Sequence, residues 1–316
     1  MGGASSIERE LFSPCPGPCP DKILQTGFQM NDTPRAQFIH TISGPETDID
    51  LTLACLYIAA EEYPVLDVTA YAERVGEFGE RANKHMRGSG GTYDAINAIN
   101  RVLFDEEGFA GNRKNYYDPA NSYLCDVLDR RTGIPITLSI LYAEVGRRTG
   151  HVFDGVGLPG HFVLGAGRSD ARIFVDPFDR GGLLTARECR LMAGRMLGRH
   201  PGDNIGDIKG DRFLKPVPKR SILHRVLNNL KAIYMREEDH HRALAAAERI
   251  QLLSPDNRDN LGDLARLQAG TGDSPAAAES LARYLELAPH DEDTRAFEAA
   301  LKAIEDGQAD IGADLA

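Results

Sequence analysis

The stretch GIPITLSILYAEVGRRTGHVFDGVGLPGHF, residues 133–162, decides the fold. Its first half predicts an α-helix, because Pro135 suits the first helical turn, where its missing N–H is tolerated. Apolar residues then recur at helical spacing, and Gly150 is a suitable C-terminal cap. The apolar stripe consists of Leu138, Leu141, Tyr142 and Val145. We expect this helix to lie deep in its domain, since it is apolar on much of its circumference.

Three short strands are expected after the helix, at residues 151–156, 161–164 and 172–175. The last two flank the turn-rich loop GAGRSD and predict a hairpin. If the hairpin is symmetric about this loop, Leu164 pairs with Ile173, Phe162 with Val175, and His161 with Asp176. Directly opposed side chains have Cβ atoms about 4.5–5.5 Å apart, so an imidazole and a carboxylate should meet at one end. A one-residue slip would reverse the face of every side chain.

A histidine and an aspartate near a helix start suit a cysteine–histidine enzyme. There a thiolate is stabilised by the helix dipole and by a protonated histidine, while the aspartate orients the ring. His161 and Asp176 fit the second and third roles, but Pro135 and its isoleucine neighbours carry no nucleophilic atom. Two substitutes stay open. Thr137 has a hydroxyl, which is a poor nucleophile without a strong base, and Cys125 has a thiol ten residues before the helix.

The segment before this helix supplies further candidates. Tyr117, Asp118 and Asn121 precede the helix and are expected to line the same cleft, although YDPANS also suits a plain turn. Gly160 stands before His161, where turn geometry explains a glycine better than an oxyanion-binding role does. Cys125 has a simpler interpretation too, as a small apolar group in a helix core.

Residues 48–104 read as helical, with apolar and charged residues at helical spacing and a break at GSGGT. A repeat begins near residue 227. A shift of thirty-four residues superimposes six residue pairs: Leu230 on Leu264, Asp239 on Asp273, Ala243 on Ala277, Arg249 on Arg283, Leu253 on Leu287 and Pro255 on Pro289. This period is typical of tetratricopeptide repeats, and about three units are usually needed for stability. Two units must therefore lean on the first domain, with a helix near 294–304 as a cap.

These patterns predict an α+β domain followed by an all-α module. The expected divisions are a flexible leader at 1–29, a domain at 30–200, a linker at 201–220, repeats with a capping helix at 221–305, and a disordered tail at 306–316. The domain at 30–200 combines the N-terminal helices with the part that resembles a cysteine–histidine enzyme. Whether the leader is translated stays open, because Met30 would also be a suitable start.

Composition excludes several classes of protein. The chain of 316 residues is 42% apolar and 26% charged, with a net charge of −11, which argues against nucleic-acid binding. No apolar run is long enough for a membrane span, and no secretory signal precedes the first domain. Five scattered cysteines do not suggest a disulfide framework, and Cys15 and Cys19 lack a second ligand pair for a metal. We expect a cytoplasmic protein with no metal and no cofactor.

Five motifs carry a resemblance to a known family: NYYDPANSYL, RRTGIPITLS, GVGLPGHFVL, DPF and LLTARECR. Followed by tetratricopeptide-like repeats, they resemble the bacterial SirB-one family of transglutaminase-like proteins over roughly residues 48–305. The resemblance implies a papain-related transglutaminase core with an α-helical N-terminal part. A similar domain occurs in an animal F-box protein, where it is part of a substrate receptor of a ubiquitin ligase.

The resemblance also assigns the expected catalytic positions. In active relatives the nucleophilic cysteine begins the central helix about fifteen residues before a closing glycine, which matches Pro135 here. Their histidine matches His161, and their aspartate matches Asp176. Active relatives often use a tryptophan as an oxyanion donor, and this chain has none. Both departures weaken the case for chemistry through a thioester.

We therefore expect a non-catalytic protein that binds a protein or peptide, with Arg249 and Arg283 as test positions in the repeat groove. The alternative is an unorthodox hydrolase or transferase acting on amides or esters. It would use His161 as general base and Asp176 to orient the ring, with Thr137, water or Cys125 as nucleophile.

Overall fold

The computed structural model describes residues 33–86, 90–167, 172–198, 213–287 and 292–306. At its centre lies helix α6 (Pro135–Arg148), which begins with Pro135 at its first position, as the sequence predicts. Most of the helix is buried. The Ile134 N–H donates to Thr137 Oγ1 at 3.2 Å, so a side chain inside the helix caps its start. Gly150 follows the helix at φ 77°, a left-handed conformation that favours glycine.

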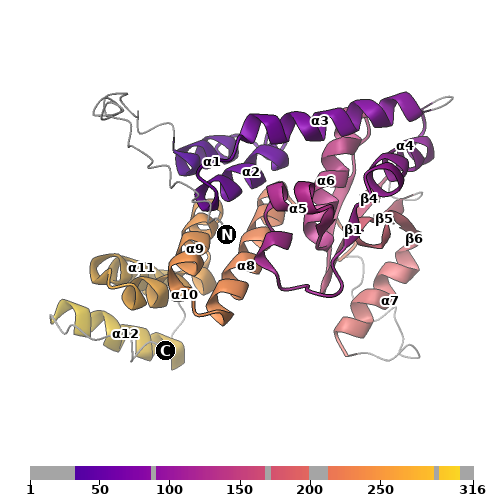
Figure 1. Ribbon diagram of the computed structural model, residues 1–316. Helices are drawn as coiled ribbons and strands as arrows, with labels where there is room; N and C mark the ends of the chain where they lie inside the picture. Colours follow the sequence, from indigo (N-terminus) through magenta and orange to yellow (C-terminus); the bar gives the residue numbers. More distant parts are fainter. Residues whose placement is uncertain (1–32, 87–89, 168–171, 199–212, 288–291, 307–316) are drawn as a thin grey trace, which may run out of the picture.

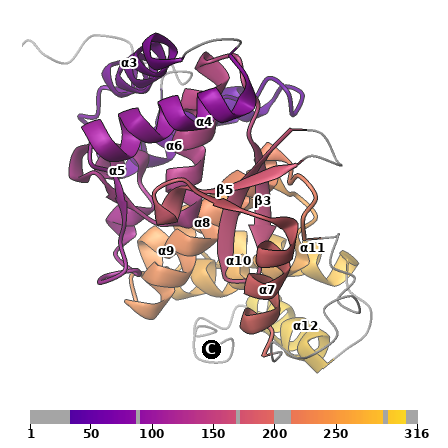
Figure 2. The same cartoon turned by 90° about the vertical axis from the view of Figure 1, so that its right-hand side faces the viewer.

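An antiparallel sheet in the order β3-β4-β5-β6 packs beside α6. Its strands are β3 (Asp154–Leu158), β4 (His161–Ala166), β5 (Ile173–Asp176) and β6 (Gly182–Leu184). Alternate residues point to opposite faces. Phe162, Leu164 and Val175 join the main core around α6, while Val156, Val163 and Phe174 form a second cluster. That second face is covered by α7 (Ala186–Met196), which stands in front of the strands in Figure 2.

The predicted hairpin register was wrong by two residues. Leu164 pairs with Val175, and Ala166 pairs with Ile173. A shift of two keeps every side chain on its expected face, because the side-chain period of a strand is also two. The first strand was also placed too early, since β3 begins at Asp154 rather than at His151, and β6 was not predicted.

Helices form the rest of the first region. They are α1 (Pro34–Ile42), α2 (Leu51–Glu62), α3 (Val68–His85), α4 (Thr92–Asn100), a π-helix η2 (Arg101–Glu106), α5 (Leu124–Arg130), and two short 3₁₀ turns, η3 (Pro119–Asn121) and η4 (Pro177–Asp179). Two short strands, β1 (Ala110–Gly111) and β2 (Thr132–Gly133), pair in parallel. Strand β2 comes directly before α6 in the chain. Neither strand was predicted, because two residues carry no period-two pattern.

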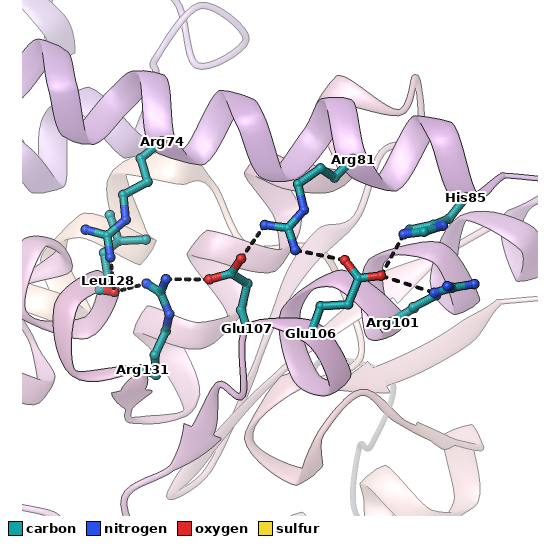
Figure 3. Close-up of polar contacts among 8 residues, drawn as sticks. All are labelled: Arg74, Arg81, His85, Arg101, Glu106, Glu107, Leu128 and Arg131. Atoms are coloured by element: carbon teal, nitrogen blue, oxygen red, sulfur yellow. Dashed lines mark hydrogen bonds and ion pairs between the residues drawn. The ribbon is translucent and has the colours of Figure 1, made fainter.

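Ion pairs connect the long helix α3 to the end of η2, and connect the end of η2 to the residue that follows α5 (Figure 3). Arg81 reaches Glu106 at 2.8 Å and also pairs with Glu107. Arg131 pairs with Glu107 from the other side. Glu106 also accepts from His85 at 2.7 Å. The hydrogen bond from Arg81 lowers the pKa of Glu106. The two adjacent glutamates thus link α3 to the segment that leads into β1.

The repeats occupy the end of the chain (Figure 1). Their helices are α8 (Lys219–Arg236), α9 (His240–Leu253), α10 (Arg258–Gly270), α11 (Ser274–Leu287) and α12 (Glu292–Glu305). The equivalent residues Leu230 and Leu264 lie on α8 and α10, and Ala243 and Ala277 lie on α9 and α11. The main core extends without interruption from Phe38 into α8, α9 and α10. The first repeat and one face of α10 therefore share a core with the first region, whereas α11 and α12 pack against α10 in a separate cluster.

A partly buried group of ion pairs reinforces this contact. Glu61 on α2 accepts from Arg35 at 2.8 Å and also pairs with Arg249 on α9. Arg249 is only 5% exposed, so our placement of this arginine in a binding groove was wrong. Burial makes it a support for the contact between α2 and α9. Arg283 is exposed and pairs with Asp256 at 2.6 Å.

The leader, most of the tail and the first twelve residues of the proposed linker lie outside the described residues, as do Cys15 and Cys19. Within the described ranges, no helix is both long and apolar enough to cross a membrane. The same part of the chain contains no group of three or more metal-ligating side chains.

Candidate functional site

His161 and Asp176 lie at neighbouring strand ends. His161 begins β4 and Asp176 ends β5. His161 Nε2 and Asp176 Oδ2 are 2.8 Å apart, and the side chains are 14% and 8% exposed. In the observed register the two residues are diagonal neighbours, not directly opposed. Diagonal neighbours on one face remain within reach of long or aromatic side chains.

Asp176 has a second task in the fold. Its other oxygen, Oδ1, accepts from the Phe178 N–H at 3.0 Å and from the Asp179 N–H at 3.3 Å. These donors are the free N–H groups at the start of η4, which makes Asp176 a capping residue. The same carboxylate therefore orients the imidazole and holds the turn that follows β5.

Two aromatic rings lie next to the imidazole in sequence of contact, and an arginine binds the backbone of His161. Phe178 meets the His161 ring edge-on with centroids 6.0 Å apart, and Tyr116 meets Phe178 at 6.5 Å. Arg225 on α8 donates from Nη2 to the His161 backbone oxygen at 3.1 Å. Sequence reasoning missed all three residues. The DPF motif could have indicated Phe178, but Arg225 lies sixty-four residues from His161 and carries no local signal.

Close contacts link this histidine to the start of α6. A Cβ atom on Gly111 of β1 would lie 2.5 Å from a ring atom of Phe178, so only glycine fits there. Gly111 pairs with Gly133 of β2. Ile134 then separates β2 from Pro135, the first residue of the helix. Pro135 is the position where active relatives are expected to carry cysteine.

Thr137 follows Pro135 by two residues and is fully engaged in structure. It is 1% exposed. Its hydroxyl donates to the Asn121 backbone oxygen at 2.8 Å and accepts from the Ile134 N–H. A threonine must release its hydroxyl proton to a base before it can attack. Here that proton already serves a backbone carbonyl.

The other substitute nucleophile, Cys125, is also buried. It lies on α5, is 3% exposed, and belongs to the main core. Burial raises the pKa of its thiol to about 12, with a further contribution from the nearby Asp126. A reactive cysteine shows the opposite shift, because the thiolate is the nucleophile.

A cavity of about 240 Å³ opens beside the helix start. It is lined by Tyr116, Tyr117, Ile134, Asn229, Ala232, Ile233 and Arg236. The Arg236 guanidinium stacks over the Tyr117 ring at 4.5 Å. The walls therefore come from the segment before α5, from the start of α6, and from α8 in the first repeat.

The residues expected to line a cleft have different surroundings. Tyr117 lines this cavity and is 59% exposed. Asp118 caps η3 and pairs with Arg130 at 2.7 Å. Asn121 is fully buried, and its side-chain amide donates to the Asn115 backbone oxygen at 2.7 Å. Gly160 has φ 66° in the two-residue turn between β3 and β4, where Pro159 precedes it, as in a type II turn.

The geometry can support two kinds of chemistry. The histidine–aspartate pair could take a proton from water or from a bound substrate. The tyrosines and aliphatic residues of the cavity could hold an apolar side chain of another molecule. The described residues near the helix start offer no activated thiol or hydroxyl for covalent catalysis.

Comparison with known proteins agrees with both regions of the fold. A family model for the transglutaminase-like superfamily matches residues 69–228. A tetratricopeptide repeat model matches residues 230–302. The chain is 37% identical to a UPF0162 protein of Xylella fastidiosa strain Temecula1, over 76% of this chain and 85% of that protein. A UPF0162 protein of Vibrio cholerae is 30% identical over 51% of this chain and 57% of its own length.

A similar region also occurs in a longer animal protein. F-box only protein 21 of Mus musculus is 36% identical over 150 residues, which are 45% of this chain and 22% of that protein. No solved structure gives a significant match. The first family model covers the sheet and helix α6, and the second covers helices α9 to α11 and most of α12. The chain therefore belongs to the transglutaminase-like superfamily, in the family of UPF0162 proteins.

Proposed function

We propose that this protein is a non-catalytic binding or regulatory protein whose transglutaminase-like site has lost its nucleophile. One observation carries the proposal: Ile134, Pro135 and Ile136 present only aliphatic side chains where catalysis needs a thiolate. The His161–Asp176 pair is retained beside this position, and Asp176 also caps η4. Its structural task gives a reason for the aspartate to persist without catalysis.

The cavity beside Ile134 is the binding site that we infer. At about 240 Å³ it suits one or two side chains rather than a large small-molecule ligand. Tyr117 and Ile233 offer apolar contact, and Arg236 adds a cation at the rim. An extended peptide with an apolar residue next to an acidic one fits this combination of groups. Because α8 forms one wall, the repeats contribute to the same site.

Selection from a random peptide library, followed by calorimetry, tests this proposal. Ala232→Arg should weaken the selected peptides at least tenfold, because Ala232 is exposed and a long side chain there fills the cavity mouth. Ala70→Arg, an exposed position on α3, is the matched control and should bind as wild type does. Failure to select any peptide, or equal binding by the Ala232 variant, would contradict the proposal.

The enzymatic alternative has one observation in its favour, the 2.8 Å contact between imidazole and carboxylate. A hydrolase of this kind would activate water directly, with His161 as general base. Turnover of an amide and ester panel that disappears in His161→Ala would replace the binding proposal. Turnover that is unchanged in this variant would exclude His161 as the base.

Two finer assignments belong to the same proposal. The motifs quoted above support membership of the SirB-one family, and the composition supports a cytoplasmic location. The match to F-box only protein 21 covers a minor part of that protein, which supports the use of this domain as a module within larger assemblies. The partner that we propose is a protein or peptide.

A further inference from the structure

A second cavity, of about 340 Å³, lies against α6 between Ser139 and Arg147. Helix α6 contributes Ser139, Ala143 and Glu144, β4 contributes Phe162 and Leu164, and α8 contributes Ile222. Arg147 and Lys219 also line it. The cavity beside Ile134 shares no lining residue with this one. Most of its wall is aliphatic or aromatic, and a cavity of this size accepts a small organic molecule.

Ser139 is an unusual residue for such a wall. It is fully buried, and its hydroxyl has no hydrogen-bond partner among the residues that the structure describes. A buried hydroxyl without a partner is costly, so most such groups are paired. An unpaired hydroxyl on the wall of a cavity is what a site for a polar atom requires.

Glu144 is the most deeply buried charged group of the lining, which also includes Thr47, His151 and Asp154, and its charge is poorly compensated. It is 4% exposed. Arg147 Nε donates to one carboxylate oxygen, Oε2, at 3.1 Å. Within the described ranges, the other oxygen, Oε1, receives no hydrogen bond. Burial raises the pKa of Glu144, and the nearby Asp50 adds to this effect.

The two cations at this cavity are shared with other acceptors. Lys219 Nζ donates to the backbone oxygens of Thr47 and Ile49, at 3.1 and 2.5 Å. Arg147 is half exposed and also faces Asp50, with its Nη2 atom 3.5 Å from the carboxylate. Each cation therefore compensates Glu144 only in part. A bound cation would supply the missing charge, whereas a bound anion would add to the buried negative charge.

We propose that this cavity binds a small primary amine with an apolar body, with the ammonium group against the Glu144 carboxylate. The apolar body lies between Phe162, Leu164 and Ile222. Ser139 is five residues before Glu144 on the same helix, about 7.5 Å along its axis, and can take a hydrogen bond from a second polar atom. This site is independent of the peptide site proposed above.

Calorimetry with three probes of similar shape tests the charge preference: 2-phenylethylamine, 2-phenylethanol and 3-phenylpropionate. At neutral pH we expect the amine to bind at least tenfold more tightly than the alcohol, and the carboxylate to bind most weakly. Glu144→Gln should remove the preference for the amine and leave alcohol binding unchanged. Glu80→Gln changes an exposed glutamate on α3 in the same way and should bind as wild type does.

Ala143→Phe adds bulk inside the cavity and should abolish binding of all three probes. Circular dichroism shows whether that variant is folded, and the Glu144 result stands without it. Equal affinity for amine and alcohol, tighter binding of the carboxylate, amine binding unaffected by Glu144→Gln, or no binding by the wild type would each overturn the proposal. Peptides selected at the Ala232 cavity should bind Glu144→Gln normally, so each proposal can fail without the other.

Discussion

The region at the start of helix α6 and the cavity along the rest of this helix differ in how their polar groups are paired. At the N-terminal end, the Thr137 hydroxyl and both Asp176 oxygens have partners within the protein. At the cavity along the rest of the helix, the Ser139 hydroxyl has no partner among the described residues, and the Glu144 carboxylate accepts a hydrogen bond from one arginine. Thr137, Ser139, Glu144 and Asp176 are all buried, so the difference does not come from exposure of these side chains to water.

This contrast separates a site that holds its own shape from a site suited to a ligand. Saturated polar groups stabilise a fixed geometry and have little left to offer another molecule. Unsaturated buried groups are costly, and a ligand that pairs with them recovers that cost. The end of α6 that resembles an active site is therefore the more structural of the two.

Removal of the Asp176 carboxylate should have the largest effect. Asp176→Ala leaves two backbone N–H groups of η4 and the imidazole without an acceptor. At about 1 kcal/mol for each lost hydrogen bond, we expect the free energy of unfolding to fall by about 3 kcal/mol. Urea denaturation measures this quantity. Asp176→Asn keeps an acceptor for the backbone and should lose about 1 kcal/mol; equal losses for both variants would show that capping is not the main contribution.

Two hydroxyls on the same helix give a matched comparison. Thr137→Val removes a hydrogen bond to Asn121 and the cap on Ile134, and should cost about 1–2 kcal/mol. Ser139→Ala removes a hydroxyl that has no partner in the described structure, and should leave stability unchanged or slightly higher. Thermal or urea unfolding of both variants decides. If Ser139→Ala lowers the free energy of unfolding more than Thr137→Val does, the contrast between the two regions is wrong.

A smaller and pH-dependent difference is expected for Glu144→Gln. The pKa of Glu144 is raised above its ordinary value of 4.5. At a pH between 4.5 and the raised pKa, Glu144 is protonated more often in the folded protein than in the unfolded chain. The contribution of Glu144 to the free energy of unfolding therefore falls as the pH rises. The glutamine variant lacks this loss. Its stability relative to wild type should therefore increase from pH 4 upward, as urea denaturation across a pH series would show; a constant difference would contradict it.

The smallest expected effect concerns Cys125. Because burial raises the pKa of this thiol to about 12, iodoacetamide at pH 8 should leave it unlabelled in the folded protein. Labelling should appear only after denaturation, with the peptide identified by mass spectrometry. Rapid labelling of the native protein would instead support Cys125 as a substitute nucleophile and weaken the non-catalytic proposal.

Periodic features were predicted well from local sequence. The apolar stripe and Pro135 placed the start of α6, and the thirty-four-residue period placed the repeat helices. The hairpin register failed by two residues, because the loop GAGRSD is not centred in the turn and its sequence does not fix the register. Local patterns specify elements, whereas register depends on how the sheet packs against its neighbours.

The candidate sites were only partly predictable for a related reason. His161 and Asp176 share one hairpin, so spacing predicted that they meet, although they are diagonal neighbours rather than the directly opposed pair of the predicted register. Tyr116 stands beside Tyr117, which the sequence did indicate, whereas Arg225 reaches the same region from a distant segment and has no local signal. Arg249 looked like a groove residue by its repeat position, yet its contact with α2 buries it.

By itself, the sequence determined the transglutaminase-like character, the central helix, the repeats and the lack of a nucleophilic side chain at Pro135. These depend on residue identity and on periods of two, 3.6 or thirty-four residues, which are local properties. Only the tertiary structure decided that the Thr137 hydroxyl is occupied, that Arg249 is internal, and that Ser139 and Glu144 border a cavity. Burial and hydrogen-bond partners come from segments far apart in the chain, so they exist only after those segments have packed together.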